Sequence, residues 1–186
     1  CIRDRYRLGG TSGGARPKIM TKIDGEDWII KFPAHVDGKN AGLMEYRYSQ
    51  CAKQCGIDME ETRLFPSDIC DGYFGTKRFD RKNGEKLFSQ TLAAIMPGAD
   101  DYMKLCWIAE TLKLPQEDKD QIFIRMVFNY VAGISDDHNK NISFIMDKAG
   151  VWRLSPAYDV MFTANTWENS SAHIHLSLIH ISEPTR

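Results

Sequence analysis

The sequence predicts an α+β protein with a strand-rich N-terminal part and a mostly helical C-terminal part. Three observations lead to this prediction. Short alternating apolar patterns separated by turn residues dominate the first 80 residues, helical periodicity dominates residues 87–132, and one further strand pair follows. The chain has 186 residues and is 42% hydrophobic, which suits one domain, or one two-lobed domain, with a real core.

The first elements are a glycine-rich segment and a strand pair. Residues 9–18, GGTSGGARPK, contain too much glycine for the interior of a stable helix or strand. The strand pair is predicted around the turn Asp24-Gly25. Its second strand, at 27–32, should end at Pro33.

The first helix is expected after Asn40, a suitable N-cap, and should end at Gly56. Its apolar residues recur at spacings of four, three and four, at Met44, Tyr48, Cys51 and Cys55. This spacing places two cysteines on what we expect to be the buried helix face. The five cysteines of the chain match no zinc-site spacing, so we interpret them as reduced core cysteines of a cytosolic protein.

The next segment combines strands and helix. Residues 62–80 predict two more strands around the turn Asp71-Gly72. The charged stretch 80–86 predicts a loop or a lobe boundary. Residues 87–114 are predicted to be helical, with a break at a Pro-Gly pair in the middle.

The last elements are a long helix and a hairpin. Pro115, followed closely by two acidic residues, should begin a strongly apolar helix that runs to about Ala132. A polar loop follows at 134–144. A second hairpin is then expected on either side of residues 148–150.

The charge balance excludes some functional classes. With 24 basic and 25 acidic residues, the net charge is −1, which gives no electrostatic footprint for nucleic acid or an acidic membrane. No apolar run approaches the roughly 20 residues that span a bilayer, and no signal peptide is visible. We therefore expect a cytoplasmic protein.

The polar loop, ISDDHNKNISF, lies between two apolar stretches. A plain surface loop would account for it, and so would a catalytic loop. Asp136 precedes Asn141 by five positions, and Asp159 follows after one hairpin. Protein kinases place a catalytic Asp, an Asn and a metal-binding Asp in this order. The first Asp accepts the proton of the attacking hydroxyl, and the oxygens of the other two residues suit Mg²⁺.

The N-terminal part contains other groups that phosphoryl transfer from ATP requires. Backbone N–H groups of the glycine-rich segment, at Gly13 and Gly14, can cradle phosphates. Lys31 would contact the phosphates, and Glu45 would hold Lys31 in place. Each feature alone has a plain explanation, such as a solvent-facing lysine. Together, and in this order, they indicate kinase chemistry with ATP and Mg²⁺.

The chain resembles the HipA-family kinases, the serine/threonine kinase toxins of bacterial toxin–antitoxin pairs. The matching stretches are GGTSGGARPK, WIIKFP, MEYRYSQCAKQCGI, TKRFDR, ISDDHNKNISF and RLSPAYDV, between about Gly9 and Phe162. The resemblance implies a protein-kinase-like, two-lobed α+β fold. Its N-lobe would occupy residues 1–80, and a partial helical C-lobe with the catalytic loop would occupy residues 81–175.

The resemblance also implies roles in the catalytic loop. Asp136 would be the catalytic Asp, and Asn141 and Asp159 would bind Mg²⁺. His138 and Lys140 lie beside the catalytic Asp; the histidine would brace the loop and the lysine would reach the γ-phosphate. The residue between Asp136 and His138 receives no role.

Two further roles concern the nucleotide. Residues 77–79 resemble the segment that joins the lobes, so Lys77, Arg78 and Phe79 would lie against adenine. The glycine-rich loop of the family carries an autophosphorylated serine that switches the kinase off. The matching hydroxyls in this chain are Thr11 and Ser12, and alignment from the lysine of GARPK favours Thr11.

The chain departs from the family at both ends. Full-length members carry an N-terminal subdomain before the glycine-rich loop, so this chain resembles a short split-type kinase or a fragment. Residues 176–186, LSLIHISEPTR, resemble a translated sequencing adapter, and we exclude them from the fold as a non-native tail. The helical lobe is therefore expected to be incomplete.

The leading interpretation is an ATP- and Mg²⁺-dependent serine/threonine protein kinase, the toxin of a type II toxin–antitoxin pair. A HipB-like helix-turn-helix antitoxin is its expected partner, and an aminoacyl-tRNA synthetase its expected class of substrate; neither direct nucleic-acid contact nor membrane contact is expected. Two alternatives stay open. One is a kinase for a small molecule with the same core, and the other is a catalytically inactive fragment that binds the antitoxin.

Overall fold

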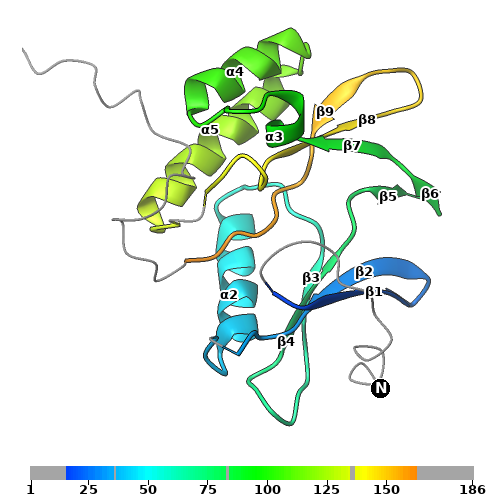
Figure 1. The fold of residues 1–186 in the computed structure, drawn as a ribbon, viewed down its shortest axis with the longest axis vertical. Coiled ribbons are helices and arrows are strands. Elements are labelled where there is room, and N and C mark those ends of the chain that lie inside the picture. The colour runs from blue at the N-terminus through cyan, green and yellow to red at the C-terminus, as the bar shows by residue number, and fades with distance from the viewer. Residues whose placement is uncertain (1–15, 36, 83, 135–136, 163–186) are drawn as a thin grey trace, which may run out of the picture.

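A computed structural model describes residues 16–35, 37–82, 84–134 and 137–162 (Figure 1). Its N-terminal group begins with an antiparallel sheet in the order β1-β2-β4-β3. The strands are β1 (Lys18–Ile23), β2 (Glu26–Lys31), β3 (Thr62–Phe65) and β4 (Tyr73–Lys77). Both predicted strand pairs are therefore confirmed. At the first turn, Asp24 and Gly25 both have positive φ, 53° and 84°, which the Asp-Gly sequence favours.

Helix α2 (Ala41–Gln54) packs against this sheet through β3 and β4 (Figure 1). Its buried residues are Glu45, Ser49 and Ala52. The predicted buried face was wrong, because Cys51 and Cys55 are exposed. The buried side of α2 instead runs along Glu45, Ser49 and Ala52, because the Glu45 side chain turns toward β2.

The segment predicted as helix from residue 87 begins instead as a strand. A small hairpin of β5 (Arg81–Lys82) and β6 (Glu85–Lys86) leads into β7 (Phe88–Thr91). Strand β7 pairs with β8 (Ser143–Met146), which pairs with β9 (Trp152–Leu154). The pairing with β8, a partner distant in sequence, overrides the local helical pattern. The predicted hairpin of β8 and β9 is confirmed.

The described C-terminal residues also form the helices α3 (Leu92–Ile95), α4 (Tyr102–Thr111) and α5 (Gln116–Val131). Thr91 begins α3, and its hydroxyl accepts a hydrogen bond from the Ala94 amide at 3.2 Å. An ion pair of 2.6 Å between Glu110 and Lys119 joins the end of α4 to the start of α5. The predicted helix after Pro115 is confirmed.

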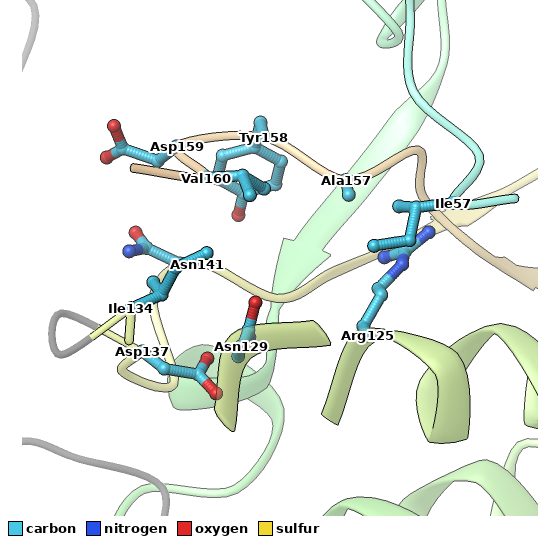
Figure 2. A pocket seen from close by; sticks show the side chains of 10 residues that line it. All are labelled: Ile57, Arg125, Asn129, Ile134, Asp137, Asn141, Ala157, Tyr158, Asp159 and Val160. Atoms are coloured by element: carbon cyan, nitrogen blue, oxygen red, sulfur yellow. The ribbon is translucent and has the colours of Figure 1, made fainter. Parts of the chain in front are cut away.

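Helix α5 exposes large apolar side chains on one side and turns polar side chains toward the interior. Its exposed side carries Phe123, Val127 and Tyr130, whereas Arg125 and Asn129 face the interior and line a small cavity (Figure 2). The sequence predicts a strongly apolar helix, but the polar side chains point inward. There Arg125 donates to the backbone carbonyl of Ser155, and Asn129 donates to the hydroxyl of Tyr102.

A shared core holds the two groups together. Ala52 of α2 packs in one buried cluster with Phe128 of α5 and Ala157 and Val160 of the segment after β9. The candidate site is built on this junction. Within the described ranges, none of the helices combines the length and apolarity needed to cross a membrane.

Candidate active site

Three charged residues from distant parts of the chain meet at the junction. The Lys31 ammonium lies 2.5 Å from the Glu45 carboxylate and 2.5 Å from the Asp159 carboxylate. Alternation along β2 explains why Lys31 points here: Trp28 and Ile30 are buried on the opposite face of the sheet. The structure therefore brings together the lysine, the glutamate and the second aspartate of the predicted site.

Burial makes this contact strong. The side chains of Lys31 and Glu45 are only 13% and 3% exposed. Burial by itself lowers the pKa of Lys31, but the carboxylates of Glu45 and Asp159 outweigh it and raise that pKa well above its ordinary value. Lys31 therefore stays a cation at any physiological pH.

Glu45 receives help from a second cation. Burial raises the pKa of Glu45, and the Lys31 ammonium opposes that shift. The Arg16 guanidinium lies 3.8 Å from the other Glu45 oxygen and also binds Asp37 at 2.9 Å. Two cations therefore lie beside the buried Glu45 carboxylate and oppose the rise of its pKa that burial causes.

Asp159 sits at a fixed bend after β9. Its φ is 58°, a left-handed conformation that Asp adopts more readily than most residues. Backbone hydrogen bonds hold the preceding segment, from Ser155 to the Ser143 carbonyl at 2.9 Å and from Ala157 to the Asp58 carbonyl at 2.8 Å. Lys31 lowers the pKa of Asp159, so this partly exposed carboxylate is ionised.

Asn141 and Asp159 line one small cavity of about 30 Å³ and project toward the same side of it (Figure 2). Within the described part of the chain, no group of three or more His, Cys, Asp or Glu side chains could hold a metal alone. Mg²⁺ does not need such a cage, because it is commonly held by one or two protein oxygens together with phosphates and water. The donor set therefore fits Mg²⁺ bound with a nucleotide.

The predicted catalytic loop is only partly described, because Asp136 lies outside the described residues. After it, the Asn141 amide donates to the His138 carbonyl at 2.8 Å and closes a turn. The Lys140 side chain is exposed, and its carbonyl accepts a hydrogen bond of 2.8 Å from the Tyr158 hydroxyl. That bond ties the loop to the residue before Asp159.

Residues 77–79 are placed differently from one another. Lys77 pairs with Trp28 in the sheet, on the face opposite Lys31, and binds Glu61 at 3.0 Å. Arg78 forms two hydrogen bonds with Asp80, at 2.8 and 2.7 Å. Phe79 stacks on Tyr158, with ring centroids 5.5 Å apart. Phe79 therefore lies beside the segment of Asp159, whereas Lys77 does not face the site.

Residues 9–15 of the glycine-rich segment lie outside the described residues. The predicted phosphate cradle of Gly13 and Gly14 and the autophosphorylation candidates Thr11 and Ser12 fall within residues 9–15. Their assignments rest on the sequence. Arg16, which lies in the last part of this segment, is described, and its guanidinium lies 3.8 Å from the Glu45 carboxylate.

The HipA-like C-terminal domain family matches residues 10–183 of the chain. The chain belongs to this family. A Sinorhizobium fredii protein, Y4dM, named as a candidate kinase, is 27% identical over 164 residues, which cover 78% of this chain and 39% of the relative. The chain thus spans about two fifths of the length of this curated relative.

Two solved structures show the same fold. HipA of Shewanella oneidensis MR-1, in a complex with HipB and operator DNA, has a TM-score of 0.60 at 20% identity, over 83% of this chain and 44% of that one. The Helicobacter pylori proinflammatory kinase CtkA has a TM-score of 0.63 at 17% identity, over 77% of this chain and 54% of that one. These likenesses confirm the predicted α+β, kinase-like fold of this HipA-like domain.

The sequence did not reveal the residues of α5 that support the site. In this HipA-like domain, α5 supports the site through Asp118, which accepts from Arg153 at 2.8 Å and from the Leu154 amide at 2.8 Å. Arg125 donates to the Ser155 carbonyl at 2.8 Å, and burial lowers its pKa to about 10. The recurrence of polar residues on one stripe of α5, continuing into its apolar second half, was the available signal.

Proposed function

We propose that this HipA-like domain transfers the γ-phosphate of ATP to a serine or threonine hydroxyl of a protein, with Mg²⁺ as cofactor. The observation that carries the proposal is the position of Lys31 between Glu45 and Asp159, 128 residues from the latter in sequence. This contact provides the lysine, its orienting glutamate and a metal-binding carboxylate in one place.

Each residue then has a distinct task. Lys31 binds phosphate oxygens while Glu45 fixes its direction. Asp136 accepts the proton of the attacking hydroxyl, whose oxygen forms the new bond to the γ-phosphorus as ADP leaves. Asn141 and Asp159 hold Mg²⁺, which when bound offsets the negative charge of the phosphates.

The partner and substrate are proposed from the relatives. The Shewanella HipA structure contains HipB and its operator DNA, and we propose a HipB-like antitoxin as the partner of this domain, with DNA contacted through that partner. The family resemblance favours a protein substrate such as an aminoacyl-tRNA synthetase. Because the chain spans 39% to 54% of the lengths of its relatives, these proposals concern the whole protein.

ATP binding should require Mg²⁺. Asn141 and Asp159 offer hard oxygen ligands, and Asp159 already neutralises Lys31 at 2.5 Å; a metal that binds Asp159 frees this lysine for phosphate. Calorimetric titration of ATP with Mg²⁺ and with EDTA measures the effect. Equal affinity in the two conditions would contradict the metal assignment.

When the protein is incubated with Mg²⁺ and ATP, it should also phosphorylate its own glycine-rich loop at Thr11 or Ser12. A phosphate there adds a charge of about −1.5 to −2 where the γ-phosphate must lie, so it should inhibit ATP binding. Mass spectrometry locates the site, and the Asp136→Asn variant is the control. Phosphate found only outside residues 9–18, or equally in the control, would exclude this mode of regulation.

A further inference from the structure

The catalytic loop is attached to α4 through a residue that has no role in the proposed chemistry. The Asp137 carboxylate accepts a hydrogen bond from the Tyr102 hydroxyl. Tyr102 is 3% exposed, and the Asn129 side chain donates to the same hydroxyl at 3.4 Å. One buried hydroxyl thus joins α4, α5 and the loop.

Tyr102, which anchors the loop, is itself held firmly at the start of α4. Tyr102 is the first residue of α4, and the preceding Asp101 caps the helix by accepting from the Lys104 amide at 2.7 Å. Burial and the neighbouring Asp137 raise the pKa of Tyr102. The phenol therefore keeps its proton and donates to a carboxylate, which gives a stronger hydrogen bond than two neutral groups would.

The two halves of the loop are held separately. On the far side, which follows His138 in sequence, the Asn139 side chain donates to the Ala99 carbonyl at 2.8 Å. The backbone carbonyl of Asn139 accepts a hydrogen bond from the Ala93 amide at 3.0 Å. On the near side, Asp137 directly follows Asp136 in sequence. The Tyr102 contact therefore acts at the residue next to the proposed base.

The direction of Asp137 matters for charge. In Figure 2 its carboxylate points toward Asn129 of α5, whereas Asn141 and Asp159 project to another side of the cavity. If the Asp137 carboxylate pointed toward the bound phosphates, its negative charge would repel them. The hydrogen bond from Tyr102 holds this charge on the helix side.

We propose that Tyr102 is a positioning residue for phosphoryl transfer, which holds the near side of the catalytic loop through Asp137. This inference rests on the proposed function. It differs from a general packing role because it requires the phenolic oxygen and its acceptor, while the ring alone would suffice for packing.

The first test replaces the hydroxyl and keeps the ring. Tyr102→Phe should lower kcat for phosphoryl transfer by about 10- to 100-fold, the usual effect of a small misplacement of a catalytic group, and leave KM for ATP within about twofold. Tyr130→Phe is the matched control, because Tyr130 is 64% exposed on α5. Equal loss in both variants, or an effect on KM alone, would overturn the proposal.

A double-mutant cycle tests whether the pair acts as one unit. Asp137→Asn keeps an oxygen acceptor but removes the charge, so its loss of kcat should be smaller than that of Tyr102→Phe. The double variant should lose little more than Tyr102→Phe alone. Losses that multiply would show that the two residues act independently, which contradicts positioning through Asp137.

Hydrogen–deuterium exchange separates this inference from the proposed function. Tyr102→Phe should speed exchange at the amides of residues 137–142, and Tyr130→Phe should not. If the unmodified chain transfers no phosphate but this difference appears, the positioning contact stands and the proposed function fails. If exchange at residues 137–142 is the same in all three proteins, the positioning contact is wrong whatever the activity.

Discussion

Asp136→Asn is expected to lower phosphoryl transfer by roughly 10²- to 10⁴-fold, the usual effect of losing a general base, while ATP affinity stays nearly intact. The amide keeps the size of the side chain but cannot accept the proton of the attacking hydroxyl. The change should therefore appear in the chemical step and not in ground-state binding. Rapid-quench measurement of transfer, together with calorimetric ATP titration, separates the two quantities.

Asp159→Asn should instead change the affinity for ATP. It removes charge from a proposed Mg²⁺ ligand and from the partner that lies 2.5 Å from Lys31, so nucleotide binding itself should weaken. Asp120→Asn is a suitable control because Asp120 is exposed on α5 and accepts a hydrogen bond from Gln116. If the Asp136 and Asp159 variants changed binding and turnover in the same way, this division of roles would be wrong.

Elements with strong local signals were predictable from the sequence. The Asp24-Gly25 turn fixes the first hairpin through two positive φ angles, and Pro115 marks the start of α5. In both cases the residue type itself restricts the backbone, so no distant partner is needed. The resemblance to HipA added the order of the site residues along these elements.

Elements set by distant contacts were less predictable. Residues 88–91 form a strand because β8 lies beside them, although the local pattern favours a helix. The threonine cap at Thr91 was the one local sign of a new helix starting there. Likewise, the spacing of Cys51 and Cys55 cannot reveal that α2 turns Glu45 toward the core instead.

The supports of the site were hidden for a related reason. Asp118, Arg125 and Asn129 recur at spacings of seven and four, and such polar residues on a helix normally face solvent. Here they face inward because distant parts of the chain offer partners: the Leu154 amide of β9 for Asp118, the Ser155 carbonyl after β9 for Arg125, and the Tyr102 hydroxyl of α4 for Asn129. The contact of Tyr102 with Asp137 joins residues 35 positions apart, which no local pattern indicates.

Lys31→Met is expected to lower the free energy of unfolding by about 3–5 kcal/mol, the usual effect of removing one partner from a buried ion pair. Methionine fills a similar volume, so the loss comes from the charge of Glu45, which is 3% exposed and would lose its 2.5 Å ion pair, while the Arg16 guanidinium lies farther away at 3.8 Å. Urea unfolding measures the change, and ATP binding should be lost as well.

The pH dependence and a second substitution identify the cause. Without the lysine, burial raises the pKa of Glu45 further, so the folded state binds a proton more readily than the unfolded state. Stability of the variant should then fall as the pH rises through that pKa, and its deficit should shrink as the pH is lowered toward it. Lys31→Met combined with Glu45→Met removes the buried carboxylate and should recover most of the lost stability. A deficit that is independent of pH and persists in the double variant would show that packing, and not the charge of Glu45, accounts for the effect of Lys31.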